Sequence, residues 1–170
     1  MSDWLWNELH DLFDTDDGSL PEIDVRYSGV NATAGGYSLL RGRAASVATE
    51  TPCFWSKGHG EERPLDSVPN AASLVLSGEA EPFHVVLGGL RSNGAVVPDL
   101  GVFVFPGRLT LDYRMGPGWG PGELRGLFRL LSDLAALDPS TSVSLQAGVV
   151  PEVAGRFRSA WCRYQTEHAA

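Results

Sequence analysis

The sequence predicts an α+β fold, in which helices pack on a mostly antiparallel sheet, and a single domain over residues 1–170. Three observations lead to this fold class. Of the 170 residues, 43% are hydrophobic, which is enough for a buried core. Stretches with apolar residues at helical spacing are interspersed with stretches that alternate polar and apolar residues, as strands do. A Pro-Gly pair between two strand-like stretches predicts a hairpin, which favours antiparallel pairing.

The first third of the chain predicts a helix, a strand and a second helix. The first helix covers residues 3–14, where leucines recur at helical spacing, and it ends in the turn that leads to Gly18. Residues 22–27 alternate strictly and predict a half-buried strand with three inward side chains, Ile23, Val25 and Tyr27. The second helix covers residues 31–46.

The middle of the chain is rich in predicted strands. Residues 53–55 form a short strand, residues 72–76 a strand or a short helix, and residues 83–87 a strand. Between the first two lies a polar stretch, residues 56–70, that contains glycine and two prolines. Because such stretches form surface loops, it is the best candidate for a mobile or functional loop.

The last part of the chain begins with the predicted hairpin, whose arms are residues 100–105 and 108–113. The first arm is apolar on both faces, so we expect it to lie inside the sheet with cover on both sides. A glycine- and proline-rich loop follows, and after it come the clearest helix, a short strand and a final helix, at residues 122–137, 143–145 and from Pro151.

Charge is the most informative global property. The formal net charge is −8, and residues 1–25 hold eight acidic residues and no Lys or Arg, so the rest of the chain is neutral. A protein that binds the phosphates of nucleic acid or an anionic membrane needs the opposite sign, so we expect neither partner. An acidic surface suits a basic partner or cations, although it also serves solubility alone.

Several site patterns fail on inspection. Aligning Gly18 with the glycine of a calcium-binding EF-hand loop puts Phe13 at the first ligand position, where it cannot bind the ion. The loop at residues 116–122 occupies a strand-to-helix position like that of a phosphate loop, but it lacks Lys and Ser/Thr and contains two prolines. Its Trp119 either fills the core or is exposed as an anchor for a partner.

The histidines and cysteines give no recognised catalytic or metal pattern. Cys53, His59 and Glu62 could form a zinc site, but their spacing matches no known motif. Cys162 lies in an apolar helical stripe and is predicted to be buried, and His84 is predicted at the edge of the core. We therefore expect no enzyme activity, no metal and no cofactor. Two cysteines and the absence of a signal-like start favour a cytoplasmic protein with reduced thiols.

Two segments carry a resemblance to a family. They are Asp14-Thr-Asp-Asp-Gly-Ser-Leu-Pro-Glu-Ile23, which leads into a strand, and the segment from Leu100 to Trp119, which forms the hairpin and the start of the following loop. With the small size and the acidity, the chain resembles the immunity proteins of bacterial polymorphic or contact-dependent toxin systems. The resemblance implies a protein that binds a cognate toxin domain and blocks its active site.

The acidic segment then becomes the expected contact with a basic cleft in the toxin, because opposite charges steer association. Trp4 or Trp119 would add apolar anchoring. The expected partner-binding residues are Asp11, Asp14, Asp16, Asp17, Glu22, Asp24, Trp4 and Trp119. Two alternatives remain open: a small enzyme or ligand-binding domain that uses residues 56–70, and a structural or adaptor domain of a larger assembly.

Overall fold

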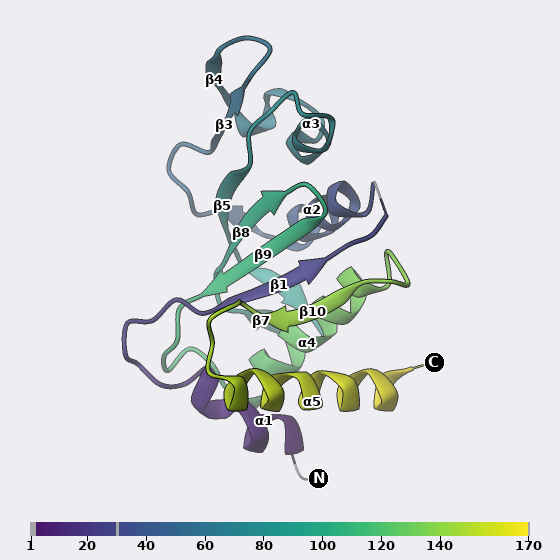
Figure 1. Ribbon diagram of the computed structural model, residues 1–170. Helices are drawn as coiled ribbons and strands as arrows, with labels where there is room; N and C mark the ends of the chain where they lie inside the picture. Colours follow the sequence, from purple (N-terminus) through teal and green to yellow (C-terminus); the bar gives the residue numbers. More distant parts are fainter. Residues whose placement is uncertain (1–2, 30, 170) are drawn as a thin grey trace.

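A six-stranded antiparallel sheet forms the centre of the computed structural model, which describes residues 3–29 and 31–169 (Figure 1). The order of the strands across the sheet is β10-β1-β9-β8-β5-β2. Each neighbouring pair is antiparallel. The strands are β1 (Glu22–Arg26), β2 (Ser46–Val47), β5 (Phe83–Gly88), β8 (Leu100–Phe105), β9 (Arg108–Tyr113) and β10 (Ser142–Leu145).

Two short hairpins lie outside this sheet. One pairs β3 (Cys53–Ser56) with β4 (Glu61–Pro64), and the other pairs β6 (Leu90–Ser92) with β7 (Ala95–Val97). The stretch 56–70, predicted as a loop, therefore contains a strand and the short 3₁₀ turn η2 (Leu65–Ser67). Sequence reading missed β4 because the strand is polar and, among the described residues, its only pairing is with the preceding strand, β3.

The described residues form five α-helices, and together with the antiparallel sheet they confirm the predicted α+β class. The first predicted helix is shorter than expected and continues as a 3₁₀ turn, η1 (His10–Leu12). The helices are α1 (Trp4–Leu9), α2 (Ala32–Arg43), α3 (Ala71–Ser77), α4 (Pro121–Ala135) and α5 (Pro151–His168). None of these helices in the described part of the chain is long and apolar enough to cross a membrane.

Helices α2 and α4 cover one face of the sheet (Figure 1). Their close approach depends on Gly36 of α2, since a Cβ atom there would lie 2.7 Å from Leu109 of β9 and 3.4 Å from Leu134 of α4. Helix α5 packs on α4 through aromatic contacts, with the rings of Phe157 and Phe128 5.7 Å apart. These elements bury the predicted inward residues of β1.

The opposite face of the sheet carries no helix from the described residues, which corrects the expected cover on both sides of the first hairpin arm. Strand β8 does lie between β9 and β5. Its residues Val102 and Val104 face the helices and are fully buried, whereas Phe103 and Phe105 face the other way and are half-buried. The apolar pattern correctly predicted that β8 lies inside the sheet. It wrongly predicted that both faces of β8 are covered.

One cysteine also lies elsewhere than expected. Cys162 is exposed, because the buried stripe of α5 is made by Phe157, Ala160, Trp161 and Tyr164, and Cys162 falls one position beside it. The stretch 72–76, for which a strand or a short helix was predicted, belongs to helix α3. That helix begins at the side-chain cap of Asn70 and ends at Gly78 in the left-handed conformation.

Candidate interaction surface

The predicted acidic residues divide between a loop and the sheet. The loop that joins η1 to β1 carries Asp14, Asp16 and Asp17, which are all exposed, and it protrudes at the lower left of Figure 1. Hydrogen bonds from Ser19 hold the pKa of Asp17 below its usual value. Within the described residues, neither Asp16 nor Asp17 forms an ion pair, so this loop presents negative charge to the solvent.

Asp11, which precedes this loop, and Asp14, which begins it, contact basic side chains. Asp11 accepts a hydrogen bond from Nη2 of Arg156 at 2.7 Å, which ties η1 to α5. Asp14 lies 3.2 Å from Nδ1 of His10 within the same segment. The charge of Asp11 is thus partly neutralised within the molecule, and the loop from Asp14 to Asp17 carries the stronger local field.

Glu22 and Asp24 lie on the uncovered face of the sheet, in β1. Glu22 is half-buried and pairs across the strands with Asp112 of β9. Asp24 is 6% exposed, and its carboxylate accepts a hydrogen bond from Oγ1 of Thr110 at 2.7 Å. Asp24 therefore joins two strands, and Glu22 is the better placed of the two for contact with a partner.

Aromatic side chains occupy the centre of the same face. The rings of Phe103 and Phe105 are stacked with centroids 5.8 Å apart, and the guanidinium of Arg108 lies 4.3 Å from the Phe105 ring. His84 lies 4.2 Å from the Phe103 ring and bonds Asp112 through Nε2 at 2.7 Å. The result is an apolar centre with charged side chains around it.

A glycine makes room for this arrangement. A Cβ atom at Gly101 of β8 would lie 2.1 Å from the carboxylate of Asp112. Without a side chain at Gly101, Asp112 can lie flat across β8 and reach His84 on the next strand. The acidic residues Glu22 and Asp112 thus form one end of the face, and Arg26 and Arg108, which pair across β1 and β9, form the other.

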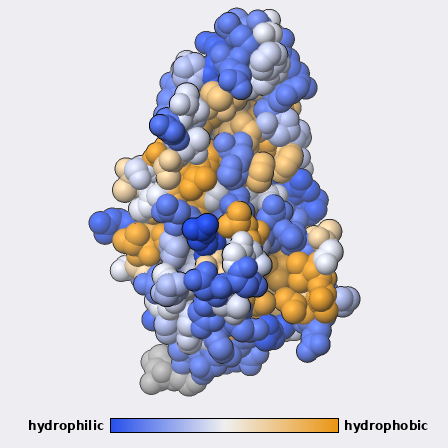
Figure 2. All heavy atoms as spheres, turned by 90° about the vertical axis from the view of Figure 1, so that its left-hand side faces the viewer, coloured by the Kyte–Doolittle hydropathy of each residue, from blue (hydrophilic) through white to orange (hydrophobic). Residues whose placement is uncertain are grey.

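The face is shallowly concave. A hollow of about 450 Å³ lies on it, lined by side chains of β1, β8 and β9 and by Gln146 and Ala147, which follow β10. Another hollow, of about 560 Å³, lies elsewhere in the molecule, between helices. Figure 2 views the molecule from the side on which the acidic loop protrudes, and hydrophobic groups alternate there with hydrophilic ones. A hydrophobic centre with a polar rim is the usual anatomy of a protein–protein contact.

Of the two predicted tryptophan anchors, Trp119 lies in the core and Trp4 is half-buried against α5. Trp119 is 5% exposed, packs against the rings of Phe13 and Tyr113, and donates its indole N–H to the carbonyl of Arg114 at 2.9 Å. Of the two interpretations of Trp119, the structure therefore favours the core. Trp4 is half-buried, donates its indole N–H to Glu167 and lies under the guanidinium of Arg163.

The alternative site at residues 56–70 is a hairpin with a polar turn. Oγ of Ser56 lies 2.9 Å from Nδ1 of His59, and burial, followed by the nearby Glu62, raises the pKa of the Cys53 thiol. A raised pKa disfavours the reactive thiolate. In the part of the chain that the structure describes, no three His, Cys, Asp or Glu side chains come together to hold a metal ion.

The sequence pattern predicted that Phe103 and Phe105 would be covered, and it did not mark Arg108 as a candidate site residue. The sequence signal that could have placed these residues on the surface lies in the second hairpin arm, where Arg108, Thr110 and Asp112 alternate with apolar residues. Paired strands share their faces, so a polar face on one arm means that the neighbouring arm turns its side chains on that face toward solvent. Comparison with protein-family models, with curated proteins and with solved structures found no match to this chain.

Proposed function

We propose that this chain is an immunity protein, which binds and neutralises a cognate toxin domain, and that the uncovered sheet face and the adjoining acidic loop form its binding surface. The observation that carries the proposal is the pair of stacked phenylalanines on a concave sheet face that no described helix covers. Aromatic side chains supply much of the affinity of protein contacts because their burial removes a large apolar area from water.

The acidic loop supports the same proposal because it adjoins that face. The carbonyl of Pro21, at the end of the loop, accepts a hydrogen bond from the backbone N–H of Tyr113 at 3.1 Å, and Glu22 follows at once in β1. Negative charge therefore continues from Asp14, Asp16 and Asp17 to the acidic end of the sheet face. A toxin with a basic cleft would be attracted by this charge before the apolar centres meet.

The acidic loop and the two phenylalanines are expected to affect different rate constants of binding. The acidic loop raises the rate of association, because long-range attraction acts before contact and is screened by salt. Phe103 and Phe105 lower the rate of dissociation, because the part of each ring that is exposed in the free chain becomes buried in the complex. A toxin whose basic active-site groups are covered in this way can no longer bind its substrate.

The test begins with affinity capture from the cells that encode the chain, eluted with a salt gradient. The retained basic protein is then produced with and without this chain, and its toxicity to an indicator strain is measured. We expect one protein at near-stoichiometric amount whose toxicity is abolished by co-expression. A partner that is not toxic, or whose toxicity persists in the complex, would refute the proposal.

Variants separate the two parts of the surface. D14N/D16N/D17N is expected to slow association by about tenfold at low salt and to flatten its salt dependence. The matched control E50Q/E61Q/E81Q changes the same number of exposed acidic residues near the β3–β4 hairpin and should leave association unchanged. Equal effects of both variants would mean that net charge alone, and not this loop, guides binding.

The aromatic part is tested by F105A. We expect dissociation to speed up by about tenfold or more, which corresponds to the loss of a contact worth at least about 1.4 kcal/mol. The control V96A shortens a side chain that is 50% exposed on β7, away from the sheet face, and should leave dissociation unchanged. Unchanged dissociation of F105A would remove the sheet face from the binding surface.

A further inference from the structure

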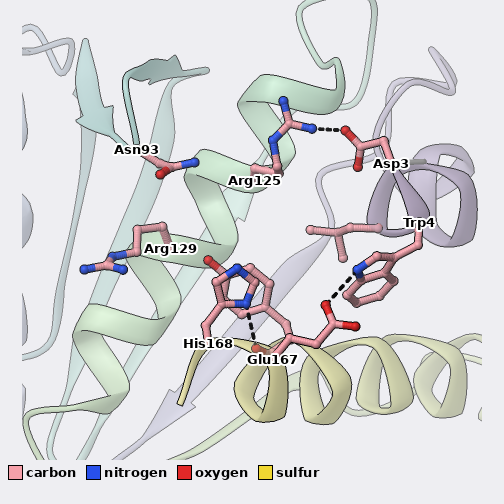
Figure 3. A pocket seen from close by; sticks show the side chains of 9 residues that line it. Asp3, Trp4, Asn93, Arg125, Arg129, Glu167 and His168 are labelled. Carbon is pink, nitrogen blue, oxygen red and sulfur yellow. Dashed lines mark hydrogen bonds and ion pairs between the residues drawn. The ribbon is translucent and has the colours of Figure 1, made fainter. Parts of the chain in front are cut away.

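A second hollow, of about 560 Å³, lies on the helical side of the molecule, away from the proposed toxin-binding face. It is formed where α1, α4 and α5 converge with the turn between β6 and β7 (Figure 3). Its size is within the range of pockets that hold small molecules.

Arginine side chains supply the positive groups of the hollow. Arg125 and Arg129 are one turn apart on α4 and line the same hollow. Arg125 pairs with Asp3, whose other carboxylate oxygen accepts a hydrogen bond from the backbone N–H of Trp6 at 3.3 Å. Arg129 lies 3.2 Å from Asp133. Asp133 is shared, because it also binds the guanidinium of Arg43 at 2.6 Å and so only partly compensates Arg129.

The remaining acidic side chain at the hollow is already compensated. Glu167 accepts hydrogen bonds from Arg163 at 2.8 Å and from the indole of Trp4 at 2.9 Å, and these contacts hold its pKa below its usual value. Among the described residues, Arg125 and Arg129 balance Asp3 and Glu167 in the lining itself, and the neighbouring Arg43, Arg163 and Asp133 bring the cluster to four arginines and three carboxylates. The cluster in and around the hollow therefore carries one net positive charge in a chain whose formal net charge is −8.

Flat side chains and an amide complete the lining. The imidazole of His168 is stacked on the ring of Tyr164, with centroids 4.0 Å apart and an angle of 18° between the planes. The Tyr164 ring is itself held edge-on against Phe128 of α4. Asn93, at the β6–β7 turn, has a φ of 52° and points its side chain toward the hollow in Figure 3.

We propose that this pocket binds a small molecule that carries an oxyanion, a carboxylate or a phosphate, on a flat ring. The oxyanion would lie against Arg129 and Arg125, because guanidinium groups bind such oxygens with paired N–H donors. The ring would lie against the stack of His168 and Tyr164. Binding would also join α1 to α4 and α5, since all three helices line the pocket.

Isothermal titration calorimetry with four probes tests whether binding needs both the oxyanion and the ring. Adenosine monophosphate and benzoate carry an oxyanion and a ring, inorganic phosphate lacks the ring, and adenosine lacks the charge. We expect saturable binding of at least one of the first two, at least about tenfold tighter than that of the last two. Whether the phosphate or the carboxylate probe binds tighter identifies the source of the oxyanion.

Variants locate the binding site. R129Q removes the less compensated arginine and is expected to weaken binding by about tenfold or more, with R129K intermediate because it keeps the charge but loses the paired donors. R158Q is the matched control, since Arg158 is exposed on α5 and forms no ion pair among the described residues. Melting temperatures of the variants show that each is folded.

Three results would overturn the inference. They are no binding of any probe at millimolar concentration, equal binding of inorganic phosphate and adenosine monophosphate, and equal loss of binding in R129Q and R158Q. None of them bears on the toxin-binding proposal, because the pocket lies on the helical side of the sheet and the proposed toxin contact lies on the other.

Discussion

Asp138 shows how much one side chain organises in this fold. It follows α4, and its carboxylate accepts hydrogen bonds from the backbone N–H groups of Ser140, Ser28 and Gly29, at 3.0, 2.8 and 2.7 Å. It therefore joins the turn before β10 to the turn after β1. These bonds, led by those from Ser140 and Gly29, lower the pKa of Asp138.

A lowered pKa makes a prediction about acid stability. The ionised form is favoured in the folded state, so Asp138 stabilises the protein above its unfolded pKa of about 4. This contribution is lost as the pH falls through the lowered folded pKa. D138N should therefore melt at a lower temperature than the wild type at neutral pH, and the difference should shrink below about pH 4.

Thermal melts of both proteins from pH 7 to pH 3 check this outcome. D99N is the control, because Asp99 is exposed and its side chain forms no hydrogen bond in the described part of the chain. A difference between D138N and the wild type that stays constant, or grows, toward acid pH would contradict the assigned role.

The type of a residue and its neighbours in the sequence predict whether some side chains are buried or exposed, but not all. Trp119 could be placed either in the core or on the surface, since a loop rich in glycine and proline allows both. Asp24 was expected at the surface because it is charged, yet it is buried against Thr110. Sequence cannot show such a pairing, because the partner lies 86 residues away and becomes a neighbour only through strand register.

At the scale of elements, helix α2 offers a matched pair of glycines. Gly36 faces the sheet, and a Cβ atom there would lie 2.7 Å from Leu109 and 2.9 Å from the hydroxyl of Tyr27. Gly42 lies in the last turn, and a Cβ atom there would meet no atom within 4 Å. Both have helical backbone that alanine can adopt, so they differ in their surroundings.

We predict opposite effects of alanine at the two positions. G36A should lower the free energy of unfolding by about 1–3 kcal/mol, because the added methyl group overpacks the contact with the sheet. G42A should raise it by about 0.5–1 kcal/mol, because alanine favours helix over glycine. Urea denaturation measures both values. Stabilisation by G36A would mean that α2 lies farther from the sheet than described.

Elements with strong local patterns were predictable, and those that depend on distant partners were not. The apolar stripe of α4 predicts a helix, and the Pro106-Gly107 pair predicts a hairpin, without knowledge of the rest of the chain. Strand β2 has only two residues and pairs with β5, some 40 residues on, so no local pattern marks it. The prediction that both faces of β8 are covered was wrong for the same reason, because the position of the helices over the sheet depends on how the whole chain packs.

At the scale of the whole molecule, charge is unevenly distributed. Eight acidic residues without a base lie in residues 1–25, and the loop from Asp14 to Asp17 carries three of them in exposed positions. Like charges repel in the compact state, and dissolved salt screens that repulsion. Stability should therefore increase as salt is added.

D14N/D16N should reduce this dependence on salt. At low salt we expect the variant to be more stable than the wild type by about 0.2–1 kcal/mol, the size of an exposed charge interaction, and at high salt the two should converge. Urea denaturation at low and high salt makes the comparison, with E61Q/E81Q as the control from the charge-balanced part of the chain. A gap that persists at high salt would point to a local conformational effect.

The contact between α1 and α5 has a consequence for the order in which the protein is assembled. The indole of Trp4 bonds Glu167 across a separation of 163 residues, and Arg156 reaches Asp11 in the same way. A helix of six residues has little stability by itself. During translation, α1 leaves the ribosome long before α5 exists, so it cannot dock until α5 has been made. Helix α1, although made before the other elements of this fold, is thus among the last of them to reach its place, and a nascent-chain probe on Trp4 would report its docking on α5.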